Sequence, residues 1–307
     1  MTQQPPHSGH ESAQAASPYL EALPSPPASP KILSKRRFNT TLPYNDMDLA
    51  HWRDYNTVET DSLWLWDQRE KANGHSNEYH GNCVPQILTQ LLTRYTKAGE
   101  TVLDLFLGSG TSAIEAANLG RQLVGVEIQS AMVNAVHTKL QAQQKTGPIR
   151  IVNGDSSHPQ ATQPLIQNAL GELGTEQADF LFLHPPYADI IRFSDLEGDL
   201  SNANDVDAFL DGFERVAQLG FDNLKPGRFA ALVIGDKYAQ GEWIPLGFYC
   251  LQRLNAVGFK TKSIVVKNMA GNERAKGKQA NLWRYRALKG GFYVFKHEYV
   301  MIVQKAP

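Results

Sequence analysis

The segment VLDLFLGSGTSAIEAANLGRQLVGVEI places a strand, a glycine turn, a helix and a second strand in immediate succession, and it constrains the fold more than any other feature. The apolar run at 101–107 predicts a buried strand. Gly108 and Gly110 then let the backbone turn tightly into an amphipathic helix that stops at Gly120. The second strand ends in Glu127. A strand, a helix and another strand in this order predict parallel pairing.

The same alternation continues along the chain from about residue 42. We expect further helices at 84–99, 130–145, 205–224 and 246–257, and further strands at 149–155, 179–184, 228–236, 260–268 and 291–305. These elements predict an α/β fold with a mostly parallel, doubly wound sheet. Because we expect no helix between the last two strands, we predict that they form an antiparallel pair.

The first 40 residues differ in composition from the rest. Their first three-quarters are rich in Pro, Ser, Gln and Ala, so they bury too little apolar surface to fold, and we predict a disordered tail over residues 1–40. A basic cluster at its end, Lys31, Lys35, Arg36 and Arg37, fits either a solvated linker or an arm that contacts phosphates. With 42% hydrophobic residues overall, residues 41–307 can form one large domain.

Charge and cysteine content exclude some classes of protein. A net charge of −1 argues against a protein that coats nucleic acid through overall positive charge, although a local basic face remains compatible. Cys83 and Cys250 lie far apart, which suggests a reducing compartment and predicts no metal site. We find neither an apolar run of membrane-spanning length nor a secretory signal, and we therefore expect a cytoplasmic protein without membrane contact.

The glycine turn and the acids around it suggest a nucleoside site. An acid at the end of the second strand, Glu127, can accept both hydroxyls of a ribose. The turn lacks the lysine of a phosphate-binding loop, so a cationic nucleoside without phosphates, such as S-adenosylmethionine, fits better. Asp104 would face its amino acid end. Asp155 would accept the adenine amino group or simply form a turn. The other residues expected to line this site are Phe106, Gly108, Ser109, Gly110, Thr111 and Ile128.

The strand at 179–184 ends in His184-Pro185-Pro186-Tyr187, which we interpret as a catalytic loop. Two prolines end a strand and fix the backbone, so their carbonyl groups point in a defined direction. A planar base could stack on Tyr187 while its amino group donates to the Pro185 carbonyl and to the side chain at 184. Methyl transfer to that nitrogen would then depend mostly on positioning, and a base within a duplex would first have to be flipped out.

Together, the D-x-F-x-G-S-G-T turn at 104–111 and the Pro-Pro-Tyr loop resemble those of the DNA amino-methyltransferases, which modify cytosine N4 or adenine N6. The resemblance covers about residues 77–305. It implies a Rossmann-like, S-adenosylmethionine-dependent methyltransferase fold, that cofactor, and double-stranded DNA as substrate. It also implies that the segment with His80 and Pro85 covers the methionine part of the cofactor. The sequence decides neither whether the protein forms a homodimer nor whether a cognate restriction enzyme accompanies it, and we keep both partners open.

Position 184 departs from the family, which usually has Asp, Asn or Ser there. A neutral imidazole can accept a hydrogen bond from the target amino group, whereas a protonated one cannot. Because His184 is not the Asp of most adenine enzymes, and because the residues that follow it look closer to Ser-Pro-Pro-Tyr enzymes, we slightly prefer cytosine N4 over adenine N6.

The segment 267–291 is the candidate DNA-contacting loop. It combines basic and aromatic residues, which suit phosphates and unstacked bases, although a solvated loop between two strands is the plainer interpretation. The residues expected to contact DNA are Lys267, Arg274, Lys276, Lys278, Trp283, Arg284 and Arg286.

Two other interpretations remain open at this point. An RNA amino-methyltransferase or a protein-glutamine methyltransferase would use a related Pro-Pro-Tyr loop. An inactive, methylase-like DNA-binding module would keep the fold without the reaction.

Overall fold

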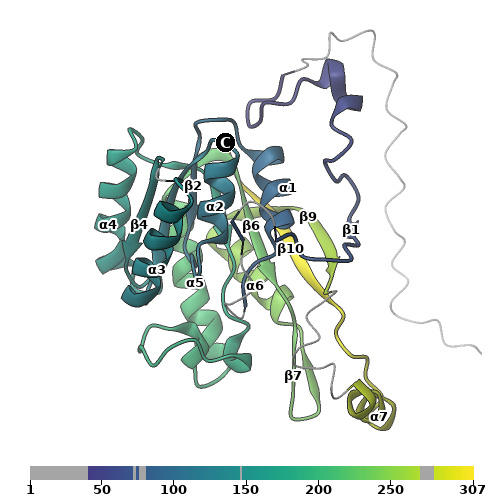
Figure 1. Ribbon diagram of the computed structural model, residues 1–307. Coiled ribbons are helices and arrows are strands. Elements are labelled where there is room, and N and C mark those ends of the chain that lie inside the picture. The colour runs from purple at the N-terminus through teal and green to yellow at the C-terminus, as the bar shows by residue number, and fades with distance from the viewer. Residues whose placement is uncertain (1–40, 72–73, 76–80, 146, 270–279) are drawn as a thin grey trace, which may run out of the picture. The chain divides into compact units, whose positions relative to one another are not determined.

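The computed structural model describes residues 41–307, except 72–73, 76–80, 146 and 270–279 (Figure 1). The tail predicted over residues 1–40 therefore lies outside the described residues. No helix in the described part of the chain is both long and apolar enough to cross a membrane.

A central sheet of eight strands runs through the described residues in the order β1-β9-β10-β6-β5-β2-β3-β4. Strand β10 is antiparallel to both of its neighbours, β6 and β9, and the remaining pairs are parallel. The strands are β1 Leu63–Trp64, β2 Thr101–Asp104, β3 Gln122–Glu127, β4 Ile149–Asn153, β5 Ala178–Leu183, β6 Leu224–Ile234, β9 Phe259–Asn268 and β10 His297–Lys305.

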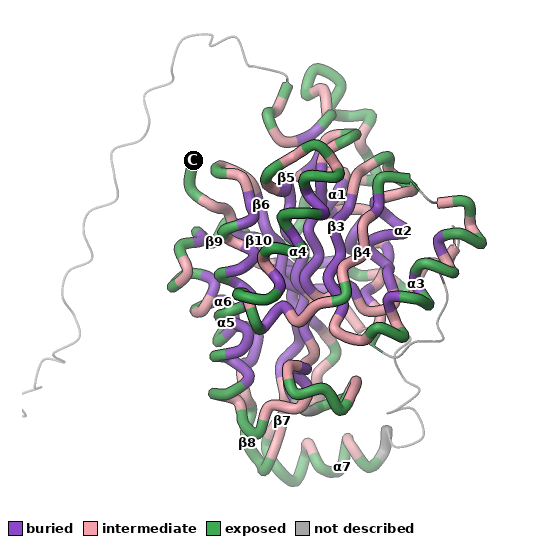
Figure 2. Tube along the Cα trace, turned by 90° about the vertical axis from the view of Figure 1, so that its left-hand side faces the viewer, coloured by how far each residue is buried: buried purple, intermediate pink, exposed green. Residues whose placement is uncertain are grey.

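Helices cover both faces of this sheet, and the strands between them are buried (Figures 1 and 2). One core cluster joins α1, α2 and α3 to one face, and a second cluster joins α4, α5 and α6 to the other. Within β2, Val102 belongs to the first cluster and Leu103 to the second, as the alternation of a strand requires. These helices are α1 Pro85–Tyr95, α2 Thr111–Asn118, α3 Ser130–Ala142, α4 Pro159–Glu172, α5 Val206–Asp222 and α6 Leu246–Val257.

Helix α5 illustrates how the sequence sets these elements. Asp205 caps its N-terminus, accepting a hydrogen bond from the Ala208 amide at 2.8 Å. Phe209, Phe213 and Val216 recur at helical spacing and are fully buried against the sheet. Short 3-10 helices, η1 Leu49–Asp54, η2 Ala188–Ile190 and η3 Leu200–Asn202, lie outside the sheet.

The structure corrects several expectations. A helix, α7 Ala280–Gly290, does separate the last two strands, although those strands pair in antiparallel fashion as predicted. The segment 267–291 is therefore no simple loop, since its described parts are the end of β9 and helix α7. We had not expected α4, β1 or the hairpin of β7 Lys237–Ala239 and β8 Glu242–Ile244. Strand β2 is also shorter than 101–107 because the glycine turn begins directly after Asp104.

The order of the strands fixes where a ligand can bind. From β2 the chain moves outward through β3 and β4, and it then returns to the other side of β2 as β5. Such a reversal opens a crevice at the carboxyl ends of the two strands. The glycine turn follows β2 and the His-Pro-Pro-Tyr loop follows β5, so both border this crevice. The predicted fold class, a Rossmann-like methyltransferase fold with antiparallel C-terminal strands, is confirmed.

Candidate active site

The glycine turn after β2 ties three elements together. Gly108 and Gly110 have φ angles of 52° and 79°, which favour glycine. A Cβ atom on Gly110 would lie 2.6 Å from a methyl carbon of Val136 in α3, so the turn packs too closely for a side chain there. Gly110 caps α2, and Thr111 begins that helix and is buried.

Glu127 links the end of β3 to this turn. One carboxylate oxygen accepts the Gly108 amide hydrogen at 2.9 Å, and the other accepts that of Gln129 at 2.9 Å. The side chain is 7% exposed, and burial raises its pKa although both amides lower it. Each carboxylate oxygen still has a lone pair that could accept a hydroxyl group.

The Asp104 side chain stabilises the start of the turn through hydrogen bonds. Its carboxylate accepts the Phe106 amide hydrogen at 2.9 Å and makes a short hydrogen bond with the Ser112 hydroxyl. Asp104 is only 1% exposed, and burial raises its pKa to about 7. A carboxyl group in this state gains from a nearby positive charge, because a cation would stabilise its ionised form.

One cleft joins the two predicted parts of the site. Phe106, Glu127, Ile128 and Asp155 line it together with Pro186 of the catalytic loop. Residues that we had not predicted close its other side, among them Gly198, Asp199, Leu200 and Val216. The structure thus brings expected cofactor residues and an expected catalytic residue to the same crevice.

Asp155 also forms a turn, in line with the simpler of its two interpretations. One carboxylate oxygen accepts the Ser157 amide at 2.8 Å and hydroxyl at 2.7 Å, and the other lies 2.6 Å from Nδ1 of His158. The contact of Asp155 with adenine stays a prediction.

His184 is half-buried in the loop after β5. Its ring lies edge-on to that of Tyr187, with 6.0 Å between centroids, and 6.4 Å from that of Phe182. Its ring nitrogens make no hydrogen bond to any of the residues that the structure describes. Burial lowers its pKa below 6.5, Arg69 and Lys267 lower it further, and Glu298 opposes them. At neutral pH the imidazole is therefore uncharged, and one of its nitrogens can accept a hydrogen bond.

The Tyr187 side chain is held by contacts with two other parts of the chain. Its hydroxyl group donates a hydrogen bond of 2.8 Å to Glu298 of β10. Burial and this carboxylate raise the pKa of the phenol well above its usual value. The ring packs on Gly235, where a Cβ atom would lie 2.9 Å from Cε2 of Tyr187.

Lys267, which we predicted to contact DNA, is instead buried and paired with a carboxylate in this structure. Its ammonium group lies 3.0 Å from the second carboxylate oxygen of Glu298, and the residue is only 4% exposed. Strand alternation explains this, because Lys267 shares a face of β9 with the core residue Val265.

Residues before α1 approach the glycine turn. The Asn82 side chain makes a short hydrogen bond with Ser109, and Arg69 donates to the carbonyls of Asn82 at 3.1 Å and Cys83 at 2.7 Å. Pro85 is buried as the first residue of α1. His80 lies outside the described residues. We had not predicted Asn82, Arg69, Gly235 or Glu298, because each contact joins distant parts of the sequence.

The remaining DNA-contact predictions divide into two groups. Arg284 and Arg286 are exposed on α7, and the Arg286 guanidinium lies 5.3 Å from the centroid of the half-buried Trp283 ring. Arg274, Lys276 and Lys278 lie outside the described residues. Beside α7, Phe292 stacks on Tyr238 of hairpin β7–β8 with ring centroids 4.1 Å apart.

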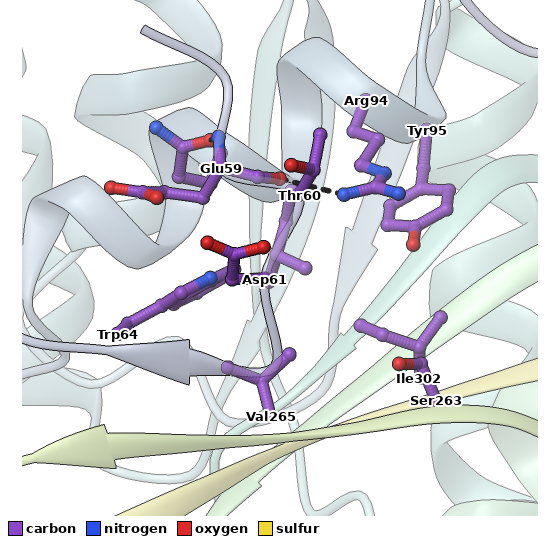
Figure 3. A pocket seen from close by; sticks show the side chains of 11 residues that line it. Glu59, Thr60, Asp61, Trp64, Arg94, Tyr95, Ser263, Val265 and Ile302 are labelled. Atoms are coloured by element: carbon purple, nitrogen blue, oxygen red, sulfur yellow. Dashed lines mark hydrogen bonds between the residues drawn. The ribbon is translucent and has the colours of Figure 1, made fainter.

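A second hollow contains none of the predicted site residues (Figure 3). It lies between α1, the segment before β1, and strands β9 and β10. Arg94 donates to the carbonyl of Glu59 there at 2.7 Å, while Trp64 and Asp61 form its other wall. The crevice at β2 and β5 remains the candidate active site.

Comparisons with protein families agree with the motifs. A family model described as DNA methylase, of the N6/N4 type, matches residues 21–138, which include the glycine turn and Glu127. A second model, described as conserved hypothetical protein 95, matches residues 84–198 and so includes the His184–Tyr187 loop. Over residues 21–138 the chain thus resembles the N6/N4 DNA methylases, which confirms the predicted resemblance to that family.

Individual relatives point in the same direction. The chain is 23% identical over 109 residues to type II methyltransferase M2.DpnII of Streptococcus pneumoniae, which covers 33% of this chain and 41% of that protein. It is 31% identical over 88 residues to type II methyltransferase M.BglI of Bacillus subtilis, which covers 29% and 23%. The chain thus spans less than half the length of these relatives. Among solved structures, TrmN from Thermus thermophilus has a TM-score of 0.47 and 17% identity, over 73% of this chain and 49% of that one.

The raised pKa of Asp104 predicts a pH-dependent effect of Asp104→Asn on the ligand-free protein. The native state holds a proton on this carboxyl up to about pH 7, whereas the pKa of an Asp exposed to water is about 3.8. Wild type therefore loses stability as pH rises through this window, while the Asn variant lacks the titrating group. Relative to wild type, the free energy of unfolding of the variant should therefore rise by on the order of 1 kcal/mol per pH unit between pH 5 and 7.

Urea unfolding at pH 5, 6, 7 and 8 measures this difference. Asparagine can still accept from the Phe106 amide and donate to Ser112, so the geometry is conserved. A free-energy difference that stays constant with pH would show that Asp104 is already ionised at pH 5.

Proposed function

We propose that this protein transfers a methyl group from S-adenosylmethionine to an exocyclic amino group of a base in double-stranded DNA. The observation that carries the proposal is that Glu127, Ile128 and Pro186 line one and the same cleft. The relationship to N6/N4 DNA methylases supports the same reaction.

The residues present fit this cofactor. Glu127 would accept the ribose hydroxyls, Asp104 would balance the charge at the amino acid end, and Asp155 would meet the adenine. Phe106, Gly108, Ser109, Gly110, Thr111 and Ile128 would form the floor, and His80 and Pro85 the cover. The bound cofactor would supply an electrophilic methyl group. No basic side chain lines the described cleft, which suits a cationic nucleoside better than a phosphorylated one.

The loop after β5 would hold the target. Tyr187 would stack on the flipped base, while the Pro185 carbonyl and the neutral His184 imidazole would accept hydrogen bonds from its amino group. These two acceptors would aim the nitrogen lone pair at the cofactor cleft, which begins at Pro186. Positioning of this kind accounts for much of the rate of a transfer reaction.

We propose cytosine N4 as the target, slightly ahead of adenine N6, because residue 184 is not the Asp typical of most adenine enzymes. The protein would act in the cytoplasm, where its DNA substrate lies, either alone or as a homodimer, and with or without a cognate restriction enzyme. An RNA or protein-glutamine amino-methyltransferase and an inactive DNA-binding module are the outcomes that the experiments below would distinguish.

Expression in a host that lacks DNA methylation tests the proposal directly. Mass spectrometry of the digested host DNA should reveal N4-methylcytosine, or otherwise N6-methyladenine. The control is the same host with the Glu127→Ala variant. If both modified bases are absent while labelled cofactor marks RNA or protein, the proposed substrate class is wrong. If nothing is labelled, an inactive DNA-binding module is the better interpretation.

His184 should give the reaction an acidic limit. Because burial lowers the pKa of the imidazole from its ordinary value of 6.5, the rate at saturating cofactor should be level between pH 8 and neutral pH. It should fall in the acidic range, as the pH passes through this lowered pKa and the acceptor becomes protonated. The His184→Asn variant cannot titrate, so its relative rate should show no such fall. If wild type and variant decline in parallel, another group sets the limit.

The exposed arginines of α7 should contribute to DNA affinity without affecting the cofactor. Replacing both Arg284 and Arg286 by Gln should weaken binding several-fold at 0.1 M salt and reduce the salt slope by about 0.9 per lost phosphate contact. Lys260 and Lys262, exposed near the start of β9, provide a control in which the same charge is removed at the other end of that strand. Equal losses in the two double variants would exclude a local contact at α7.

A further inference from the structure

A network of polar contacts links the loop after β5 to two strands of the sheet. The Tyr187 hydroxyl donates to one oxygen of Glu298 at 2.8 Å, and Lys267 lies 3.0 Å from the other oxygen. Glu298 is 8% exposed and Lys267 4% exposed. These side-chain contacts connect Tyr187 in the loop after β5 to Glu298 of β10 and Lys267 of β9.

The sheet brings these distant residues together. Glu298 is directly opposite Lys267 in the β9–β10 pair, and Tyr299 of β10 is opposite Ile234 of β6. The residue directly after β6 is Gly235, on which the Tyr187 ring packs. The tyrosine can cross the end of β6 and reach Glu298 because Gly235 has no side chain in its path.

Stability alone does not explain a buried ion pair at this place. Removing two charges from water costs several kcal/mol per ion, and well-packed apolar residues are often as stable or more so. The neighbours on the same sheet face, Val265 and Val300, are apolar core residues. The ion pair provides something that apolar residues cannot, namely a strong, fixed acceptor for the phenol.

We propose that Glu298, held in place by Lys267, is a positioning residue that fixes the ring of Tyr187 for stacking on the target base. This inference rests on the proposed function. A phenol without its acceptor could rotate about its side-chain bonds, and the base stacked on it would lose its alignment with the acceptors at 184 and 185. Neither Glu298 nor Lys267 would touch the substrate.

The decisive variant replaces the ion pair by apolar residues, Lys267→Met together with Glu298→Leu. Because no charge is left unpaired, the thermal midpoint should equal or exceed that of wild type. The maximal rate of tritium transfer from labelled cofactor to unmethylated genomic DNA should nevertheless fall by about 10- to 100-fold, with KM for the cofactor within about twofold of wild type. Tyr187→Phe, which removes only the hydroxyl, should cause a similar fall.

Combining the changes separates positioning from a general structural role. In the apolar background, Tyr187→Phe should have no further effect, since the hydroxyl has already lost its acceptor. Lys225→Met is the matched control. It breaks a lysine–carboxylate contact of 2.8 Å with Asp179, which lies at the start of β5, and it should leave the rate unchanged.

Three results would overturn the inference. The apolar pair could retain the wild-type rate, Tyr187→Phe alone could retain it, or Tyr187→Phe could reduce the rate by the same factor in both backgrounds. A wild-type protein that labels no DNA is a different outcome, because it would overturn the proposed function and this inference with it.

Discussion

The pairing of β2 with β5 is the constraint on which the site depends. Asp104 is opposite Phe182 in that pair, so the turn that follows Asp104 and the loop that follows β5 leave the sheet side by side. The other residues of the site contact one of these two segments. Glu127 binds the turn from β3, Pro186 borders the same cleft, and Glu298 holds Tyr187 from β10. A shift of one residue in this register would turn the side chains of β5 to the opposite face and separate the two halves.

The two halves of the crevice differ in their electrostatic surroundings. On the cofactor side, Asp104 and Glu127 are buried carboxyl groups whose pKa values are raised by desolvation. In the loop after β5, burial lowers the pKa of His184, Glu298 raises it, and Arg69 and Lys267 lower it further, so the imidazole stays neutral. The first environment favours a cation, and the second favours an uncharged planar group that donates hydrogen bonds. This asymmetry is what the proposed sulfonium donor and the proposed target base would each require.

Local signals were enough to predict the fold and to select the residues that border one crevice. Positive-φ glycines, an acid at a strand end and a proline pair each reveal their role within a few residues of sequence. Contacts between distant segments gave no such signal, as with Tyr187 and Glu298, which lie 111 residues apart. Lys267 was expected to contact DNA because it is close in sequence to many basic residues, whereas the period of the strand decides its direction. Helix α7 was missed because its composition is polar and basic, without a strong apolar stripe.

Strand β10 comes last among the described elements, yet it lies in the interior of the sheet between β6 and β9. During synthesis on the ribosome, β6 would therefore expose an unpaired edge until residues 297–305 emerge, and an unpaired edge promotes association between chains. Because Glu298 is part of the same strand, Tyr187 would also lack its acceptor until then. The nascent protein would thus complete its hydrophobic core and its base-binding surface in one late step, and a chain that stops before β10 would have neither.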